Sequence, residues 1–355
     1  MTDPSAVDPA AADAALEEQF GHRLRRDRPL DDLCTYRVGG AARWFVTIES
    51  IEDLRALASV TGRMQLRCLV VGRGSNLLVA DEGFEGVAIQ LADAFGDVSF
   101  GDISFGDISS GDISVGTGGG GLVEVTAGAA VSLPVLARRC VAEGLAGFEW
   151  AVGVPGSVGG AVRMNAGGHG SDMAASLVRV RVLDLRSGDD VDVSAADLDL
   201  SYRHSSLRDD QVVVEATLGL RPDPGVSESA LSEIVTWRRT HQPGGPNAGS
   251  VFTNPAGDSA GRLIDGAGCR GLRVGSAEVS TKHANFIQAD PGGRAEDVVA
   301  LMAEVRRRVR ELSAVDLRAE TRLVGFDPET VRAAGGAPAD PSAGGSSGGS
   351  SGGSS

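Results

Sequence analysis

The residues that suggest chemistry most directly lie in a glycine-rich stretch at 153–170, with the sequence GVPGSVGGAVRMNAGGHG. Glycine tolerates positive φ and lets the main chain approach a ligand or another segment closely. We expect a tight loop that feeds a short buried element, with the amide groups of residues 156–160 turned toward a ligand. Successive free amides form a cradle for an anion such as a phosphate. A glycine-rich hairpin that binds nothing explains this stretch equally well on its own.

A second glycine-rich loop follows an apolar run at 66–71 and reads GRGSN over residues 72–76. It lacks the third glycine of the Rossmann fingerprint and the Gly-Lys-Ser/Thr of a P-loop. Its glycines, arginine, serine and asparagine nevertheless suit a diphosphate that is held by amides and a hydroxyl group. Two such loops in one domain favour a dinucleotide cofactor more strongly than either loop does alone.

The composition narrows the class of partner and the compartment. The 355 residues include 48 acidic and 33 basic side chains, for a net charge of −15, so neither nucleic acid nor an anionic membrane is expected as the main partner. No apolar run reaches 18 residues, and the acidic, alanine-rich N-terminus does not resemble a secretory signal. The four cysteines form no C-x-x-C pair, which indicates reduced thiols and no metal site. We therefore expect a cytoplasmic protein.

Apolar patterns predict the elements that must hold these loops. Strand-like runs alternate with helices up to Pro222, and the pattern then changes to helix, short strand, helix and strand. This order predicts an α+β fold with a domain boundary near Pro222. Ser50 and Asp53 resemble a capping box, and Ser132 with Pro134 marks the start of another helix.

The predicted strands cover 43–48, 66–71, 86–91, 121–128, 177–185, 211–220, a short segment near 284–288, and 314–326. The predicted helices cover 50–59, 132–144, 230–241 and 295–312. On the last helix, four arginines are interpreted as the solvated face of an amphipathic helix, namely Arg306, Arg307, Arg308 and Arg310.

Composition also divides the chain. We expect disorder over 1–20, a first domain over 21–222, a second over 223–326, and a flexible Gly/Ser tail over 333–355. Within the first domain, residues 95–114 repeat a Gly-Asp pentapeptide. An array of calcium-binding aspartates is one interpretation of the repeat. Because so short a segment cannot stack into such an array, we favour an expanded surface loop between two strands.

Several longer motifs together resemble the UDP-N-acetylenolpyruvoylglucosamine reductase family. They occur in the family's order over about residues 30–326 and read CTYRVGG, VGRGSNLLV, GFEWAVGVPGSVGGAVRMNAGGHG, SYRHS, NAGSVFTNP, GLRVGSAEVSTKHANFI and LRAETRLVG. The resemblance implies an FAD-binding domain of the vanillyl-alcohol-oxidase (PCMH) type and a smaller α+β substrate-binding domain. It also implies NADPH-dependent reduction of UDP-N-acetylglucosamine enolpyruvate to UDP-N-acetylmuramate through noncovalent FAD, in peptidoglycan precursor synthesis.

The resemblance assigns both glycine-rich loops to FAD. The loop at 72–77 is expected on the pyrophosphate, and the stretch at 153–170 against the cofactor. The residues assigned to FAD are Gly72, Arg73, Gly74, Ser75, Asn76, Leu77, Gly153, Pro155, Gly156, Ser157, Val158, Gly159, Gly160, Asn165 and Gly167.

The implied reaction needs three kinds of group. Reducing an enol ether conjugated to a carboxylate requires a hydride donor, a cation or acid for the developing enolate, and a proton donor at the adjacent carbon. The resemblance assigns the protein's share to Arg203, Glu320 and Ser250. From the residues alone, Arg203 could be solvated and Ser250 could merely begin a turn. Glu320 could form a surface ion pair with Arg318 or Arg322. The motifs favour the catalytic interpretation of all three.

The same resemblance assigns seven residues to the sugar-nucleotide substrate, namely Tyr202, Arg239, His241, Asn254, Lys282, His283 and Asn285. His241 stands where the family often has a lysine, so we expect its contact with a diphosphate to depend on pH near neutrality. Lys282 is the only lysine in the chain, and either a binding function or none is open for it. No tyrosine follows residue 203, so the chain resembles the family's second type, which lacks a mobile tyrosine-bearing loop.

Two other functions remain open from the sequence. One is a flavin enzyme of the same fold that oxidises an alcohol or hydroxy acid with oxygen and needs no NADPH. The other is a nucleotide-sugar-binding protein without catalysis, which would purify colourless. In the favoured interpretation the protein is a monomer and its partner is a small molecule.

Overall fold

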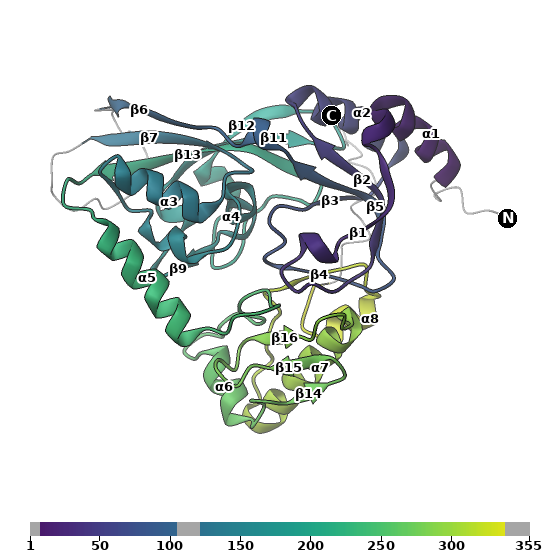
Figure 1. The fold of residues 1–355 in the computed structure, drawn as a ribbon, viewed down its shortest axis with the longest axis vertical. Helices are drawn as coiled ribbons and strands as arrows, with labels where there is room; N and C mark the ends of the chain where they lie inside the picture. The colour runs from purple at the N-terminus through teal and green to yellow at the C-terminus, as the bar shows by residue number, and fades with distance from the viewer. Residues whose placement is uncertain (1–7, 105–120, 338–355) are drawn as a thin grey trace, which may run out of the picture.

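The computed structural model describes residues 8–104 and 121–337. Two sheets and their helices form the upper part of the molecule in Figure 1, and a smaller region of helices and short strands lies below them. Helix α5 (Glu228–His241) runs from the upper part toward the lower one. The α+β architecture predicted from the sequence is confirmed.

The strands are β1 (Arg25–Pro29), β2 (Ala41–Ile48), β3 (Cys68–Val70), β4 (Leu77–Val79), β5 (Phe84–Leu91), β6 (Val98–Ser104), β7 (Leu122–Gly128), β8 (Leu145–Ala146), β9 (Gly167–Gly168), β10 (Ser171–Asp172), β11 (Leu177–Asp184), β12 (Asp190–Ser194), β13 (Gln211–Pro222), β14 (Arg273–Val274), β15 (Ala277–Val279), β16 (Ile287–Ala289) and β17 (Arg322–Val324). Besides α5, the helices are α1 (Pro9–Phe20), α2 (Ile51–Met64), α3 (Leu133–Ala142), α4 (Val158–Met164), α6 (Ala260–Gly266), α7 (Ala295–Ser313) and α8 (Pro328–Ala333).

The first sheet has the strand order β1-β2-β5-β3, in which β1 is antiparallel to β2 and the other neighbours are parallel. Helix α2 packs against β2 and β11 and buries Leu54 and Leu57. As predicted, Ser50 caps this helix, because its hydroxyl accepts the amide of Asp53 at 3.1 Å. Strand β3 ends just before the glycine-rich loop at 72–76, so this sheet holds the loop in place.

The N-terminal segment corrects one prediction. The prediction of disorder over residues 1–20 is wrong for the residues that form helix α1. Residues 1–7 lie outside the described part of the chain. Ala12, Leu16 and Phe20 are buried in the core that α1 shares with α2 and the first sheet. Their spacing of four residues places them on one face of the helix, so even an alanine-rich segment can dock.

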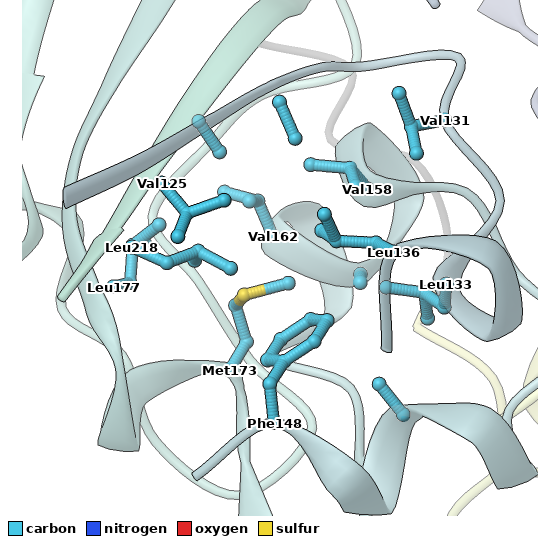
Figure 2. Close-up of a cluster of buried hydrophobic side chains, with 14 of the residues drawn as sticks. Val125, Val131, Leu133, Leu136, Phe148, Val158, Val162, Met173, Leu177 and Leu218 are labelled. Carbon is cyan, nitrogen blue, oxygen red and sulfur yellow. The ribbon is translucent and has the colours of Figure 1, made fainter. Parts of the chain in front are cut away.

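The second sheet is antiparallel, with the order β12-β11-β13-β7-β6 and β8 paired to one end of β13. Helices α3 and α4 lie below it in Figure 1. Figure 2 shows the core between them, where Phe148 and Met173 lie among Leu136, Val162 and Leu218. This core fixes α4, which carries the middle of the second glycine-rich stretch.

The Gly-Asp repeat corrects a second prediction. The prediction of a surface loop over 95–114 is wrong for residues 98–104, because they form strand β6 and pair antiparallel with β7. Val98 and Phe100 pack against the core of the second sheet. The register shifts between Phe100 and Ile103, which accommodates the Gly-Asp step as an irregularity in the ladder. Residues 105–114 of the repeat lie outside the described residues.

The C-terminal region packs α6, α8 and the sheet β14-β15-β16 around helix α7. The predicted apolar face of α7 is buried at Val298, Leu301, Met302, Val305 and Val309. The helical spacing also predicts Leu312 on this face, but Leu312 is 66% exposed because it lies in the last turn.

One arginine of α7 is not part of a solvated face. Arg306 donates from Nε to the carbonyl of Leu317 at 3.0 Å and from Nη1 to the carbonyl of Arg332 at 2.9 Å. Its side chain is only 18% exposed. The prediction that Arg306 is solvated is therefore wrong, because this side chain joins α7 to the segment before β17 and to α8.

The end of the chain returns to the first region through strand β17, which pairs in parallel with β4. Only three residues of the predicted strand at 314–326 form a regular ladder, although Ala319 also makes an isolated bridge with Phe252. The Asn76 side chain donates to the carbonyl of Glu320 at 3.0 Å. This contact brings Glu320 to the glycine-rich loop at 72–76.

Candidate active site

A cavity of about 600 Å³ is lined by residues of both the two-sheet region and the C-terminal region. The wall includes the loop at 72–76, much of the stretch at 153–169, and the last turn of α5. Arg203, Ser250 and Glu320 also line it. The fold therefore brings the three residues predicted to be catalytic to one cavity, together with both glycine-rich segments.

The loop at 72–76 has the chemistry of an anion cradle. None of its five amides donates to a protein group among the described residues. Its carbonyls, in contrast, accept from Gln90, Thr35 and Arg322 at 3.3, 3.1 and 3.0 Å. Gly74 has a φ of 58°, and a Cβ there would overlap a backbone carbonyl oxygen. The loop is thus held by its carbonyls and keeps successive amides for a diphosphate.

The second glycine-rich stretch works differently from the prediction. The prediction that the amides of residues 156–160 face a ligand is wrong for four of the five residues, because these four amides donate to protein acceptors. Gly156, Val158, Gly159 and Gly160 donate to Val154 O, Val131 O, Ala129 O and Ser157 Oγ at 2.9, 2.9, 3.0 and 3.4 Å. The glycines instead permit close packing, since a Cβ on Gly159 would lie 2.9 Å from the Cβ of Ala129.

Two of the residues assigned to the cofactor do not line the cavity. Val158 is fully buried in the core. Asn165 is 1% exposed, and its side chain donates to the carbonyl of Ser201 at 2.9 Å and accepts the amide of Ala174 at 2.9 Å. Asn165 therefore ties the end of α4 to the turn that carries Arg203. All the other residues assigned to FAD line the cavity wall.

Arg203 and Glu320 form an ion pair in the cavity wall. Arg203 donates from Nε to Glu320 Oε1 at 2.7 Å and from Nη2 to the carbonyl of Gly167 at 2.9 Å. The two side chains are 21% and 15% exposed. Burial raises the pKa of Glu320 above its usual value, and the Arg203 guanidinium opposes this shift. The pair fixes the direction of the guanidinium rather than leaving it in solvent.

Ser250 lines the cavity, and the two residues that follow it are held by two different neighbouring segments. The carbonyl of the next residue, Val251, accepts the amide of Glu320 at 2.8 Å. One residue further on, Asn285 accepts the amide of Phe252 through Oδ1 at 3.0 Å and donates from Nδ2 to the carbonyl of Phe252 at 2.8 Å. The Ser250 hydroxyl makes no hydrogen bond to the described residues, so it is free to face a ligand.

None of the seven residues assigned to the substrate lines the cavity, and these assignments stay predictions. Tyr202 is 55% exposed, with the Arg203 guanidinium over its ring. The exposed Asn254 accepts the amide of Ala260 at 3.0 Å, as a helix cap does. His283 accepts the amide of Asn285 at 3.3 Å.

Lys282 and His241, the two side chains expected to bind the substrate as cations, also have local partners near the end of α5. Lys282 donates from Nζ to the carbonyl of Arg239 at 2.6 Å. The ring of His241 hydrogen-bonds the carbonyl of Trp237 at 2.8 Å and stacks on its indole with 4.6 Å between centroids. The predicted pH-dependent contact of His241 with a diphosphate has no support in this geometry.

Sequence reasoning missed several residues of the cavity wall. Trp237 and Arg238 line the cavity where Arg239 and His241 were expected. A helix turns by about 100° per residue, so an error of one position changes the face that a side chain occupies. The arginine-rich run WRRTH carried a usable signal, but it did not reveal which arginine faces inward.

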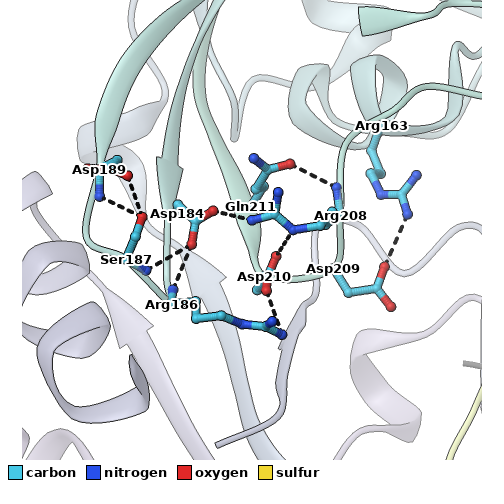
Figure 3. A network of polar contacts seen from close by, with 9 residues as sticks. All are labelled: Arg163, Asp184, Arg186, Ser187, Asp189, Arg208, Asp209, Asp210 and Gln211. Atoms are coloured by element: carbon cyan, nitrogen blue, oxygen red, sulfur yellow. Dashed lines mark hydrogen bonds and ion pairs between the residues drawn. The ribbon is translucent and has the colours of Figure 1, made fainter. Parts of the chain in front are cut away.

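Three charged residues of the wall form a cluster that also escaped prediction. Asp209 accepts from Arg163 at 3.1 Å and from Arg322 at 2.8 Å, and all three line the cavity. Figure 3 shows the neighbouring network, in which Arg208 is held by Asp184 and Asp210. The contacts of Arg208 fix the turn before β13. Arg322 and Arg163 hold the pKa of Asp209 below its usual value despite burial.

Other kinds of site are not evident in the described residues. No group of three or more His, Cys, Asp or Glu side chains there could hold a metal ion. No helix in this part of the chain is long and apolar enough to cross a bilayer. The four cysteines are free, and three of them are buried.

The fold and the amide-lined cavity define an FAD-binding flavoprotein of the vanillyl-alcohol-oxidase type. A family model described as an FAD binding domain matches residues 42–194. The fold is similar to that of the VAO-type flavoprotein MtVAO713 from Myceliophthora thermophila C1, with a TM-score of 0.52, 11% identity, and 94% and 91% of the two chains covered. Within this class, the chain belongs to the UDP-N-acetylenolpyruvoylglucosamine reductase family. The family model for the C-terminal domain of that enzyme matches residues 240–324.

Relatives support the family along most of the chain. The UDP-N-acetylenolpyruvoylglucosamine reductase of Synechococcus sp. (strain RCC307) is 40% identical over 85% of this chain and 94% of its own. The enzyme of Rubrobacter xylanophilus is 39% identical over 88% and 99%. The crystal structure of the Thermus caldophilus reductase superposes with a TM-score of 0.68 at 34% identity, over 85% and 99% of the two chains.

These findings confirm the predicted family, the fold class, the oxidoreductase class, and FAD with NADPH as its reductant. They favour the reductase over the two other functions left open by the sequence.

Proposed function

We propose that this protein reduces the enolpyruvyl group of UDP-N-acetylglucosamine enolpyruvate to UDP-N-acetylmuramate, with NADPH as reductant and FAD as cofactor. One observation carries the proposal: Arg203, Ser250 and Glu320, which come from distant segments, line the same cavity. The amides of the loop at 72–76 line it too.

The residues of the cavity fit FAD. The free amides at 72–76 suit its diphosphate, and Gly74 leaves no side chain where the loop contacts a neighbouring carbonyl. We assign the cofactor's remaining contacts to the cavity-lining residues between 153 and 167. When bound, FAD supplies hydride transfer between NADPH and the substrate.

Arg203 is the residue that we propose for stabilising the developing enolate. Hydride addition to the terminal carbon of the enol ether moves negative charge into the substrate carboxylate. A guanidinium whose direction is already fixed stabilises that charge without having to reorganise. Glu320 and the carbonyl of Gly167 fix Arg203 in this way. The other N–H groups of the guanidinium are available for the carboxylate.

Ser250 is the residue that we propose as the proton donor to the carbon next to the carboxylate. Its hydroxyl lines the cavity and has no competing hydrogen bond among the described residues. The backbone contact between Val251 and Glu320 sets its position relative to the Arg203–Glu320 pair. A serine alkoxide needs a nearby positive charge, and Arg203 is the cation that this arrangement offers.

We further propose that the protein acts in the cytoplasm as a monomer, with neither nucleic acid nor a membrane as partner. Its net charge of −15 supports the absence of polyanionic partners. Its four free cysteines suit a reducing compartment.

The experiment that tests this function separates the two half-reactions. Ser250→Ala should bind FAD and be reduced by NADPH at a nearly normal rate, because no proton donation to carbon occurs in that half. Reoxidation by the enolpyruvyl substrate should slow by the ~10²–10⁴ typical of a lost general acid. Both rates are followed by stopped-flow absorbance of the flavin, and Ser250→Cys should recover part of the second one.

The matched control is Ser259→Ala, which removes a helix-capping hydroxyl of the same region outside the cavity wall. It should leave both half-reactions unchanged. Normal reoxidation of Ser250→Ala by the substrate, or a defect confined to the NADPH step, would show that Ser250 is not the proton donor. Failure of the wild-type flavin to reoxidise with this substrate would refute the proposed reaction itself.

A further inference from the structure

Two arginines share one carboxylate in the cavity wall. Asp209 accepts from Arg163 Nη2 through Oδ1 at 3.1 Å and from Arg322 Nη2 through Oδ2 at 2.8 Å. Figure 3 shows the side chains of Arg163 and Asp209 directed toward each other. All three residues line the cavity, and among the described residues neither arginine pairs with another carboxylate. The cluster therefore holds two positive charges and one negative charge, which leaves one positive charge unbalanced.

The donors of the two arginines are only partly used. Each guanidinium gives one nitrogen to Asp209, and Arg163 Nε is buried without a hydrogen-bond partner among the described residues. Burial lowers the pKa of Arg163, and the like charge of Arg322 adds to this shift. Because a guanidinium stays charged in a protein, the surplus charge and the free donors favour a negative partner in the cavity.

Backbone contacts place the cluster beside both parts of the expected FAD site. Asn76, in the loop that we assign to the diphosphate, donates to the carbonyl of Glu320 and accepts the amide of Arg322, both at 3.0 Å. Glu320 also pairs with Arg203, which we assign to the reaction. The segment 320–322 thus contacts the diphosphate loop and carries a residue of the reaction site. Because the flavin ring is the part of FAD that reacts, we expect the cluster to lie at the flavin end of the cofactor.

Reduction adds a negative charge at that end. NADPH gives up a hydride, which is two electrons and one proton, and becomes NADP⁺. Uptake of the hydride gives the flavin one negative charge. A nearby positive charge stabilises the charged form of a group over its neutral form. Surplus positive charge in the wall should therefore raise the reduction potential of the flavin.

We propose that the cluster of Arg163, Asp209 and Arg322 sets the reduction potential of bound FAD, which the two arginines raise and the aspartate lowers. The inference goes beyond the proposed reaction, but it rests on the proposed function for the position of the flavin in the cavity. Opposite charges must then have opposite effects. A cluster that only clamps the turn before β13 to β17 would not show this dependence on sign.

The test measures the reduction potential of the FAD-loaded protein by titration with dithionite against a redox dye of known potential, without NADPH or substrate. Arg163→Met leaves a neutral Asp209–Arg322 pair and should lower the potential. Asp209→Asn leaves two unbalanced cations and should raise it. One charge should change the preference for reduced over oxidised flavin about tenfold, which corresponds to about 30 mV for a two-electron couple. The double variant has one unbalanced cation again, so its potential should return close to that of the wild-type protein.

Further variants separate charge from packing. Arg163→Lys keeps the charge and should retain the wild-type potential. Arg43→Met and Glu85→Gln each break an exposed ion pair outside the cavity wall, and neither should change the potential. If one single variant of the cluster loses FAD, the sign of the shift in the other decides.

Three results would overturn the proposal: shifts of the same sign in Arg163→Met and Asp209→Asn, unchanged potentials in both, or a double variant that departs further from the wild-type protein than either single one. Loss of FAD from both single variants would also overturn it, because the cluster would then be a structural clamp. The titration contains no enolpyruvyl substrate. A wild-type flavin that this substrate does not reoxidise would therefore refute the proposed reaction and leave the effect of the cluster standing.

Discussion

Replacing Asn285 by alanine should separate substrate binding from the placement of Ser250, the serine that we propose as proton donor. The Asn285 side chain is 4% exposed and makes both hydrogen bonds of the Phe252 backbone, at 2.8 and 3.0 Å. Alanine would leave that buried N–H and C=O without partners. Each such group costs about 1–3 kcal/mol, so the free energy of unfolding should fall by about 2–6 kcal/mol. This is a large share of the ~5–15 kcal/mol of a typical domain.

The effect on catalysis should follow from the same two bonds. They hold Phe252, two residues after Ser250, on Asn285, while an isolated bridge joins Phe252 to Ala319, the residue before Glu320. Without them the serine hydroxyl is less well placed, so the limiting rate of flavin reoxidation by the substrate should fall. The dissociation constant of the sugar nucleotide should stay unchanged, because Asn285 does not line the cavity. Reduction by NADPH should remain normal.

The assays are urea unfolding and stopped-flow reoxidation over a range of substrate concentrations. Asn254→Ala is the matched control: it removes one part-buried capping bond, so it should cost only about 1 kcal/mol and leave the limiting rate intact. In a Ser250→Ala background, Asn285→Ala should slow reoxidation no further. A raised dissociation constant with a normal limiting rate would refute this reasoning and restore Asn285 as the substrate ligand that the sequence suggested.

Three other predictions address the cofactor loop, the C-terminal packing and the buried carboxylate. Gly74→Ala should lose FAD, measured by flavin absorbance, whereas Gly266→Ala, with open space around its Cα, should retain it. Arg306→Met should lower the free energy of unfolding by about 1.5–3 kcal/mol through its lost carbonyl contacts, and the exposed Arg310→Met should change it by less than about 0.5 kcal/mol; equal effects would refute the packing function of Arg306. Because the folded pKa of Glu320 is raised, wild-type stability relative to Glu320→Gln should decline as pH rises from about 4.5 through the folded value. If urea unfolding showed that the wild-type protein becomes more stable relative to Glu320→Gln as the pH rises, the sign of that pKa shift would be contradicted.

Local signals made part of the fold predictable. The start of α2 could be predicted because Ser50 satisfies an amide three residues away, and the apolar face of α7 follows from helical spacing alone. Strand β6 could not be predicted, because a Gly-Asp repeat has low strand propensity and forms here through long-range pairing with β7. Tertiary contacts likewise decided α1, whose buried face consists of only three apolar side chains.

The site shows the same division. Arg203, Ser250 and Glu320 could be proposed from the sequence because they lie within motifs, and the fold brings them to one cavity. The direction of each glycine-rich segment could not be found, because glycine composition does not determine whether amides face a ligand or a neighbouring carbonyl. Arg238 was missed for a geometric reason. It shares a helix face with His241, three residues on, so spacing alone could not decide which of the two reaches the cavity.

The loop at 72–76, which we assign to the cofactor, contacts the segment that carries Glu320. Its amides are left for an anion, while the carbonyl of Asn76 accepts the amide of Arg322 at 3.0 Å and the Asn76 side chain donates to the carbonyl of Glu320. Strand β17 then continues the contact as a parallel ladder with β4. The last strand of the C-terminal region is therefore joined to this loop through Asn76, one of the five residues that we assign to the diphosphate.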